Sequence, residues 1–140
     1  MRYLASILAS VFLMAFVFSG QAVRAQEDVG RLLKQLEEHS DRFSKSLNQG
    51  LDSSPVNGTN TEDEINGYVK QFEDSTDRLK KNYDKGQDNR VAVQEVLGRA
   101  KSINTFLKRY KLNPTVSTDW RTVKDDLNRL AKAHKVRLGF

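Results

Sequence analysis

The chain has 140 residues, no cysteine and a formal net charge of +5 at pH 7. The lack of cysteine excludes a lipoprotein anchor, disulfides, covalent haem and thiol chemistry, so stability must come from packing. The charge is unevenly spread, because residues 26–88 hold 9 basic and 14 acidic residues whereas residues 89–140 hold 12 and 4. This asymmetry indicates either electrostatic complementarity between two helical hairpins or an anion-binding face on the second half.

The N-terminus has the pattern of a secretory signal. An uncharged apolar run over residues 4–18 follows Met1-Arg2 and is shorter than the roughly 20 apolar residues of a transmembrane helix. Val23-Arg24-Ala25 supplies small residues where a signal peptidase reads them. We therefore predict a signal peptide over residues 1–25, cleavage after Ala25 and a single domain over residues 26–140 that is periplasmic or secreted. The alternative is an uncleaved membrane anchor.

Four segments of the predicted domain carry apolar residues at the three- and four-residue spacing of a helix face. They predict helices over residues 27–49, 61–84, 90–111 and 118–134. No segment shows the two-residue period of a strand over a useful length. Helices of this length, joined mostly by short turns, favour an all-α fold, an antiparallel up-down-up-down four-helix bundle.

Local signals place the ends of the first two helices. Gly50 is predicted to end the first helix and to open the longest loop, residues 50–60. Thr61 and Glu64 have the spacing of a capping box, in which each side chain accepts a hydrogen bond from the other residue's backbone N–H. They predict where the second helix starts.

Pro114 is predicted to end the third helix, because the residue before a proline avoids the helical conformation. Ser117 or Thr118 is predicted to cap the fourth helix. Residues 135–140 alternate apolar and charged or small side chains. They form either a short extended tail packed on the bundle or a frayed end.

The fourth helix has the most regular apolar face and contains the only tryptophan. Residues on this face follow steps of three or four: Trp120, Val123, Leu127, Leu130 and His134. We predict that Trp120, Leu127 and Leu130 are structural anchors. Trp120 is expected to close one end of the bundle by packing near Leu47 and Ile65.

The histidines do not favour a metal site. The chain has only His39 and His134, and neither follows a glutamate by three residues, so the di-iron carboxylate pattern is absent. A shared zinc site is disfavoured, because a rise of about 1.5 Å per residue separates them by about 9 Å along aligned helices. We predict no metal and no cofactor.

The sequence also offers no catalytic pattern. Ser40 adjoins His39, but neighbouring positions on a helix do not face each other. Paired carboxylates are interpreted as solvated helix faces: Glu37-Glu38, Glu73-Asp74 and Asp125-Asp126. The glycines are dispersed and form no phosphate loop. The chain is therefore predicted not to be an enzyme and to have no catalytic residue.

Binding remains as the predicted class of function. The cations of the third and fourth predicted helices suggest an anion-binding face containing Arg99, Lys108, Arg109, Lys124 and Lys132. Few aromatic residues lie between them to stack bases, and nucleic acid is the wrong partner for an exported protein. An alternative is a small-ligand carrier or sensor in which Trp120, Phe106 and Tyr110 line a pocket.

Three segments carry a resemblance to a known group: residues 61–69 (Thr-Glu-Asp-Glu-Ile-Asn-Gly-Tyr-Val), Asp77-Arg78-Leu79, and Asp119-Trp120 followed by residues 126–131 (Asp-Leu-Asn-Arg-Leu-Ala). Across most of the predicted domain the chain resembles a group of small, uncharacterised exported bacterial proteins. It departs from them at the C-terminus, where a further Tyr and Trp often close the chain. The resemblance implies a helical fold and a bacterial envelope or periplasmic location, and it implies no activity.

These patterns together predict an exported, non-catalytic protein that binds or scaffolds in the bacterial envelope. The expected partner is another envelope protein or an anionic envelope surface. Membrane contact is expected only through the signal peptide, unless that segment stays uncleaved.

Overall fold

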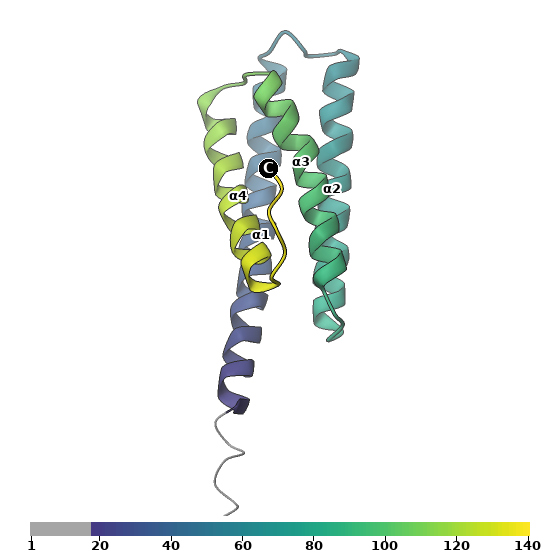
Figure 1. Ribbon diagram of the computed structural model, residues 1–140. Coiled ribbons are helices and arrows are strands. Elements are labelled where there is room, and N and C mark those ends of the chain that lie inside the picture. Colours follow the sequence, from purple (N-terminus) through teal and green to yellow (C-terminus); the bar gives the residue numbers. More distant parts are fainter. Residues whose placement is uncertain (1–17) are drawn as a thin grey trace, which may run out of the picture.

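The computed structural model describes the backbone of residues 18–140 and the side chains from Asp28 onward, and this part of the chain contains helices and no strand. The helices are α1 (Phe18–Asp52), α2 (Asn60–Asp84), α3 (Arg90–Arg109) and α4 (Pro114–Ala133). Figure 1 shows α1 and α3 running one way and α2 and α4 the other. The predicted all-α fold, an antiparallel up-down-up-down four-helix bundle, is confirmed.

The bundle consists of two closely packed helix pairs. α1 packs most extensively on α4, and α2 on α3, whereas α1 and α2, and α3 and α4, contact each other less. Each close pair thus joins one helix from the acidic half of the sequence with one from the basic half. Among the described side chains, two ion pairs connect different helices, His39–Asp126 and Arg78–Glu95, and in both the acid comes from the basic half. Among the described side chains, no cation of α3 or α4 is therefore paired with an acid of α1 or α2.

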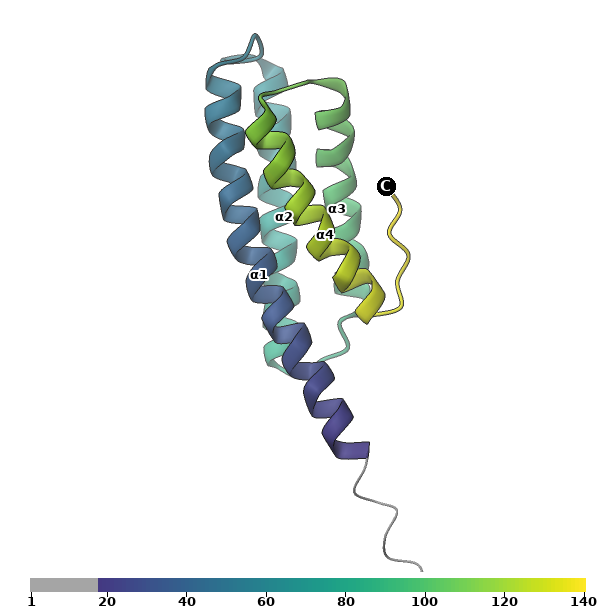
Figure 2. The ribbon, with the colours of Figure 1, turned by 90° about the vertical axis from the view of Figure 1, so that its left-hand side faces the viewer.

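Helix α1 is longer than predicted at both ends. It begins at Phe18, so the predicted cleavage site Ala25 lies within it, while residues 1–17 of the predicted signal peptide lie outside the described residues. Figures 1 and 2 both show the first part of α1 extending past the other helices. None of the helices in the described part of the chain has the length and apolar character needed to cross a membrane.

The prediction that Gly50 ends the first helix is wrong. α1 continues to Asp52, and the connection to α2 spans only residues 53–59. Gly50 is buried, and a Cβ there would lie 2.8 Å from Val116 Cγ2 and 3.2 Å from Asn113 Nδ2. The missing side chain at Gly50 therefore lets the first turn of α4 pack directly on α1.

Replacing Gly50 with alanine is expected to lower the free energy of unfolding by up to about 2 kcal/mol. Alanine gains about 1 kcal/mol of helix propensity, but overpacking costs about 1–3 kcal/mol, and Val116 is stiff and 1% exposed. The matched controls are Gly67→Ala and Gly98→Ala, since both glycines are helical and have no atom within 4 Å of a built Cβ. Chemical denaturation should show the controls stabilised by about 0.5–1 kcal/mol. A Gly50→Ala protein stabilised like the controls would contradict the close contact.

The capping box predicted at Thr61 and Glu64 does not form. Thr59 is the N-cap of α2, and the Glu62 carboxylate accepts a hydrogen bond from the backbone N–H of Gly58. Glu64 instead accepts from the Tyr68 hydroxyl. The sequence fits the Thr-x-x-Glu pattern in two frames, 59–62 and 61–64, and the helix starts in the earlier one.

The fourth helix also starts earlier than predicted. Asn113 is its N-cap, and the Asn113 Oδ1 accepts from the Val116 backbone N–H at 3.1 Å. Neither Ser117 nor Thr118 is the cap. Pro114 occupies the first helical position, where its fixed φ suits the helix and no N–H donor is needed. The same proline thus follows the end of α3, at Arg109, and opens α4.

The C-terminal tail packs on the bundle. Lys135 adopts a left-handed conformation with φ 53°, its N–H donates to the Lys132 carbonyl, and the Val136 N–H donates to the Ala131 carbonyl. This is the hydrogen-bond pattern of a Schellman motif, which reverses the chain. The apolar residues of the tail are partly buried against the core: Val136, Leu138 and Phe140. Of the two alternatives left open by the sequence, the packed tail is the one observed, and Figure 2 shows the tail turning back along the bundle from the end of α4.

Candidate ligand-binding groove

Trp120 lies in the core and is 3% exposed. Its ring centroid is 4.9 Å from that of Phe43 and 6.3 Å from that of Phe72, and its Nε1–H donates to Asn104 Oδ1 at 3.1 Å. The other two predicted anchors, Leu127 and Leu130, are fully buried. The tryptophan is therefore surrounded by side chains of the protein itself.

An open groove lies between α2 and α3, with a volume of about 270 Å³. This is slightly below the range of about 300–1,000 Å³ typical of small-molecule pockets. Helix α2 contributes Glu64 and Tyr68, helix α3 contributes Lys101, Ser102, Thr105, Phe106 and Arg109, and Tyr110 follows as the C-cap of α3. We call this the α2/α3 groove. Of the aromatic residues predicted to line a pocket, Phe106 and Tyr110 do so here, and Trp120 does not.

A stack of three side chains forms one wall of the α2/α3 groove. The Phe106 and Tyr110 ring centroids are 4.7 Å apart, and the Arg109 guanidinium carbon lies 5.3 Å from the Tyr110 centroid. Phe106 is only 4% exposed, so the stack is attached to the core. A cation over an aromatic face is favoured by about 0.5–1 kcal/mol even when exposed, so the stack restrains the guanidinium at the groove.

The opposite wall carries a carboxylate bound to a phenol. The Tyr68 hydroxyl donates to Glu64 Oε1 at 2.6 Å. This hydrogen bond is the main cause that raises the pKa of Tyr68, with smaller contributions from burial and from the Glu64 charge. Tyr68 is therefore a neutral hydrogen-bonding group near neutral pH.

The two cations of the groove have no acidic partner. Neither Lys101 nor Arg109 lies within 4.0 Å of a carboxylate among the described side chains. The one acid that lines the groove, Glu64, is hydrogen-bonded to Tyr68. The charges of Lys101 and Arg109 are thus left for solvent or for a ligand.

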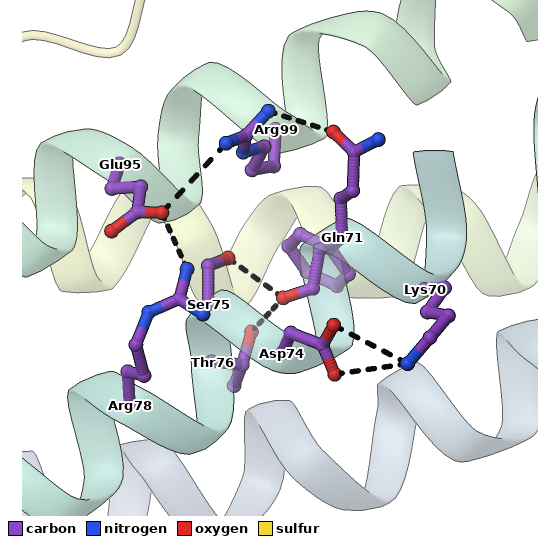
Figure 3. Close-up of polar contacts among 9 residues, drawn as sticks. Lys70, Gln71, Asp74, Ser75, Thr76, Arg78, Glu95 and Arg99 are labelled. Atoms are coloured by element: carbon purple, nitrogen blue, oxygen red, sulfur yellow. Dashed lines mark hydrogen bonds and ion pairs between the residues drawn. The ribbon is translucent and has the colours of Figure 1, made fainter. Parts of the chain in front are cut away.

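A polar network farther along the same two helices connects them (Figure 3). Arg78 of α2 donates to Glu95 of α3, and Arg99 of α3 donates to Gln71 of α2 at 2.7 Å. Arg99 also lies 3.9 Å from Glu95. The network occupies Arg99, one of the cations assigned to the predicted anion-binding face.

The structure does not gather the five predicted cations into one face. Arg99 and Lys108 are nine residues apart on α3, which is about two and a half turns, so they lie on opposite sides of the helix. Lys124 and Lys132 belong to α4, which contacts α3 far less than it contacts α1. Arg109 alone of the five lines the α2/α3 groove.

One carboxylate pair is not the solvated face that the sequence suggested. Asp125 is exposed, but Asp126 is 3% exposed and accepts from His39 Nδ1 of α1 across 2.5 Å. Arg129 lies 3.6 Å from the other oxygen of Asp126. The His39 side chain is 24% exposed, so this pair connects α1 to α4 at the edge of the core.

Glu73 is a carboxyl whose surroundings disfavour its charged form. Partial burial is the largest cause that raises the pKa of Glu73, and the hydrogen bond to Ser44 of α1 lowers it. The nearby negative charges raise this pKa further: Asp41, Asp74 and Asp77. Because the pKa of Glu73 is higher in the folded state than in the unfolded state, the folded state binds more protons at pH values between these two pKa values. Stability contributed by this group therefore falls as pH rises through that window.

Replacing Glu73 with glutamine is expected to stabilise the protein at pH 7 by about a few tenths of a kcal/mol, since solvent screens a partly exposed charge. The gain should disappear near pH 3, below the usual glutamate pKa of about 4.3, where Glu73 is itself neutral. Thermal unfolding of both proteins across this pH range measures the difference. Glu37→Gln, at an exposed site on α1, is the control. A Glu73→Gln protein that is less stable than wild type at pH 7 would contradict this account.

The two histidines are far apart in this arrangement. His39 contacts Asp126, which precedes His134 by eight residues, or about 12 Å along α4. His134 Nδ1 lies 3.1 Å from the Leu130 carbonyl oxygen of its own helix. Within the described part of the chain, no three histidine or carboxylate side chains are close enough to hold a metal ion.

Comparison of the chain with protein-family models, with curated proteins and with solved structures finds no match. The fold is therefore defined by its own geometry as a four-helix bundle, and the α2/α3 groove is its candidate binding site. The resemblance to exported bacterial proteins remains a prediction from the sequence.

Proposed function

We propose that the protein is an exported, non-catalytic binding protein of the bacterial envelope that holds a small anionic ligand in the α2/α3 groove. One observation carries the binding part of this proposal. Lys101 and Arg109 have no acidic partner among the described side chains, and they line a groove whose other wall residues are aromatic or hydroxylated, apart from Glu64. Cations in a concave, partly apolar site attract anions more strongly than the same cations on an open surface.

The ligand-binding part is tested on protein purified under native conditions from cells that express the full chain. Small molecules released on denaturation are identified by mass spectrometry, for the wild type and for Thr105→Trp, which fills the groove from an exposed position on α3. The expected result is an anion enriched on the wild type and absent from the variant. An anion-free wild type, or equal amounts on both proteins, would overturn the proposed function.

Export is a separate part of the proposal and rests on the N-terminal sequence pattern. Cell fractionation is expected to place the protein outside the cytoplasm, with Gln26 as its first residue. A cytoplasmic protein that keeps Met1 would overturn this part without affecting the groove.

A second candidate function is binding to anionic envelope surfaces through α3 and α4. It is favoured by the excess of cations on these helices, which make no ion pair with α1 or α2 acids among the described side chains. Retention on anionic vesicles should then fall steeply with added salt, since the Debye length shrinks from about 10 Å at 0.1 M to about 3 Å at 1 M. Retention that is independent of salt would count against this candidate.

A further inference from the structure

The polar groups of the α2/α3 groove lie in two facing sets. Lys101, Thr105 and Arg109 repeat every four residues on α3 and so form one stripe along the helix. Glu64 and Tyr68 repeat at the same spacing on α2. Because α2 and α3 are antiparallel and closely packed, a ligand in the groove contacts a cationic stripe on one side and a carboxylate–phenol pair on the other.

The charges of the groove sum to one positive charge. Lys101 and Arg109 are cationic, Glu64 is anionic, and Tyr68 is neutral near pH 7. A ligand with one negative charge balances this site. A ligand with several negative charges would place some of them close to Glu64, where like charges repel.

Arg109 is suited to bind a planar oxyanion. A guanidinium presents its N–H donors in a fork that matches a carboxylate with two parallel hydrogen bonds. Stacking on Tyr110, 5.3 Å from the ring centroid, restrains the guanidinium before any ligand arrives. Less side-chain entropy is then lost on binding, so recognition of the oxyanion by Arg109 is favoured.

The remaining polar groups are suited to hydroxyls. Ser102 and Thr105 make no hydrogen bond to other described residues, and one of the two Glu64 oxygens is taken by Tyr68. A purely apolar ligand would remove water from these groups and give them no partner, at a cost of about 1–3 kcal/mol for each group left buried. A ligand with several hydroxyls replaces the lost water.

We infer that the ligand of the α2/α3 groove is a small hydroxylated monocarboxylate, a sugar acid, with its carboxylate on Arg109 and its hydroxyls on Thr105, Ser102 and Glu64. This inference rests on the proposed function, because it names the ligand class of the same site. Lys101 lies eight residues from Arg109, about 12 Å along α3, and adds long-range attraction for the anion.

The test is isothermal titration calorimetry on the full exported protein at low salt, with three probes. Glucuronate has both a carboxylate and hydroxyls, glucose has only hydroxyls, and benzoate has a carboxylate on an apolar ring. Glucuronate is expected to bind at least about tenfold more tightly than either of the others, since one charge-assisted hydrogen-bond pair contributes about 1.5–3 kcal/mol.

Two variants test separately whether Arg109 binds the carboxylate and whether Thr105 binds a hydroxyl of the ligand. Arg109→Lys should weaken glucuronate about tenfold and leave glucose unchanged, because lysine keeps the charge and loses the fork. Thr105→Val should weaken glucuronate and glucose alike and leave benzoate unchanged. The matched control is Lys108→Gln, an exposed neighbour that does not line the groove, which should leave all three affinities unchanged.

The outcomes separate this inference from the proposed function. Equal affinity for glucose and glucuronate would overturn the carboxylate assignment. Benzoate binding more tightly than glucuronate would overturn the hydroxyl assignment and leave small-anion binding intact. No heat of binding from any of the three probes would overturn the sugar-acid inference. The proposed function fails only if the natively purified wild type carries no anion, or carries as much as Thr105→Trp does.

Discussion

Truncating Trp120 to alanine is expected to lower the free energy of unfolding by about 3–5 kcal/mol, the largest effect of any single substitution considered for this protein. The indole is 3% exposed and packs on Phe43 and Phe72, so its removal leaves a cavity between helices α1, α2 and α4. It also leaves Asn104, which is 5% exposed, without the N–H donor that its Oδ1 accepts from. Urea denaturation followed by circular dichroism measures the loss.

Two further variants separate packing from hydrogen bonding at this position. Trp120→Phe keeps an aromatic ring near Phe43 but removes the N–H, so it should cost about 1–3 kcal/mol for the smaller ring and the unpaired Asn104. Arg121→Ala, at the exposed next position of α4, is the control and should stay within about 0.5 kcal/mol of wild type. If Trp120→Ala unfolded at the same urea concentration as Arg121→Ala, Trp120 would not be a core residue, and a role in binding would have to be considered.

Removing His39 is expected to lower the free energy of unfolding by about 2–4 kcal/mol at pH 7. The Asp126 carboxylate, with its side chain 4% exposed, would lose the N–H donor 2.5 Å away and keep only Arg129 at 3.6 Å. An uncompensated buried charge costs more than the pair contributes when both partners are present. Chemical denaturation of His39→Ala measures the effect, with exposed Asp125→Ala as the control.

A double-mutant cycle tests whether the stability lost on removing His39 comes from its contact with Asp126. The cycle compares His39→Leu, Asp126→Leu and the double variant; the double variant should recover most of the stability lost in His39→Leu, because two apolar side chains leave no buried charge. A coupling energy near zero, or a His39→Ala protein as stable as Asp125→Ala, would mean that the contact between α1 and α4 is absent in solution.

The positions of residues on helix faces were predictable because helical periodicity is local. The spacing of Trp120, Leu127 and Leu130 places them on one face, and the structure has all three in the core. The same spacing could have identified Asp126, which lies three residues after Val123 and four before Leu130 and so falls on that face. Its charge led to the interpretation as a solvated residue. Charge alone is a poor guide where a partner from another helix is close.

The helix ends were less predictable, because one short pattern is compatible with several boundaries. Thr-x-x-Glu occurs in two overlapping frames at the start of α2, and only the fold selects the frame of Thr59 and Glu62. Gly50 suggests a helix stop because glycine has a low helix propensity. It is instead the point where Val116 approaches α1, a contact between residues 66 positions apart in sequence.

The sequence by itself determined the four amphipathic helices of the described residues and the place of Trp120 on a buried face, because both follow from spacing within a single segment. Tertiary structure alone decided that α2 packs on α3 and α1 on α4, since an apolar face does not specify its partner. That pairing brings His39 to Asp126 and places Glu64 and Tyr68 opposite Lys101 and Arg109. The candidate groove arises from this pairing, because its two walls come from segments about 40 residues apart that the packing of α2 on α3 brings together.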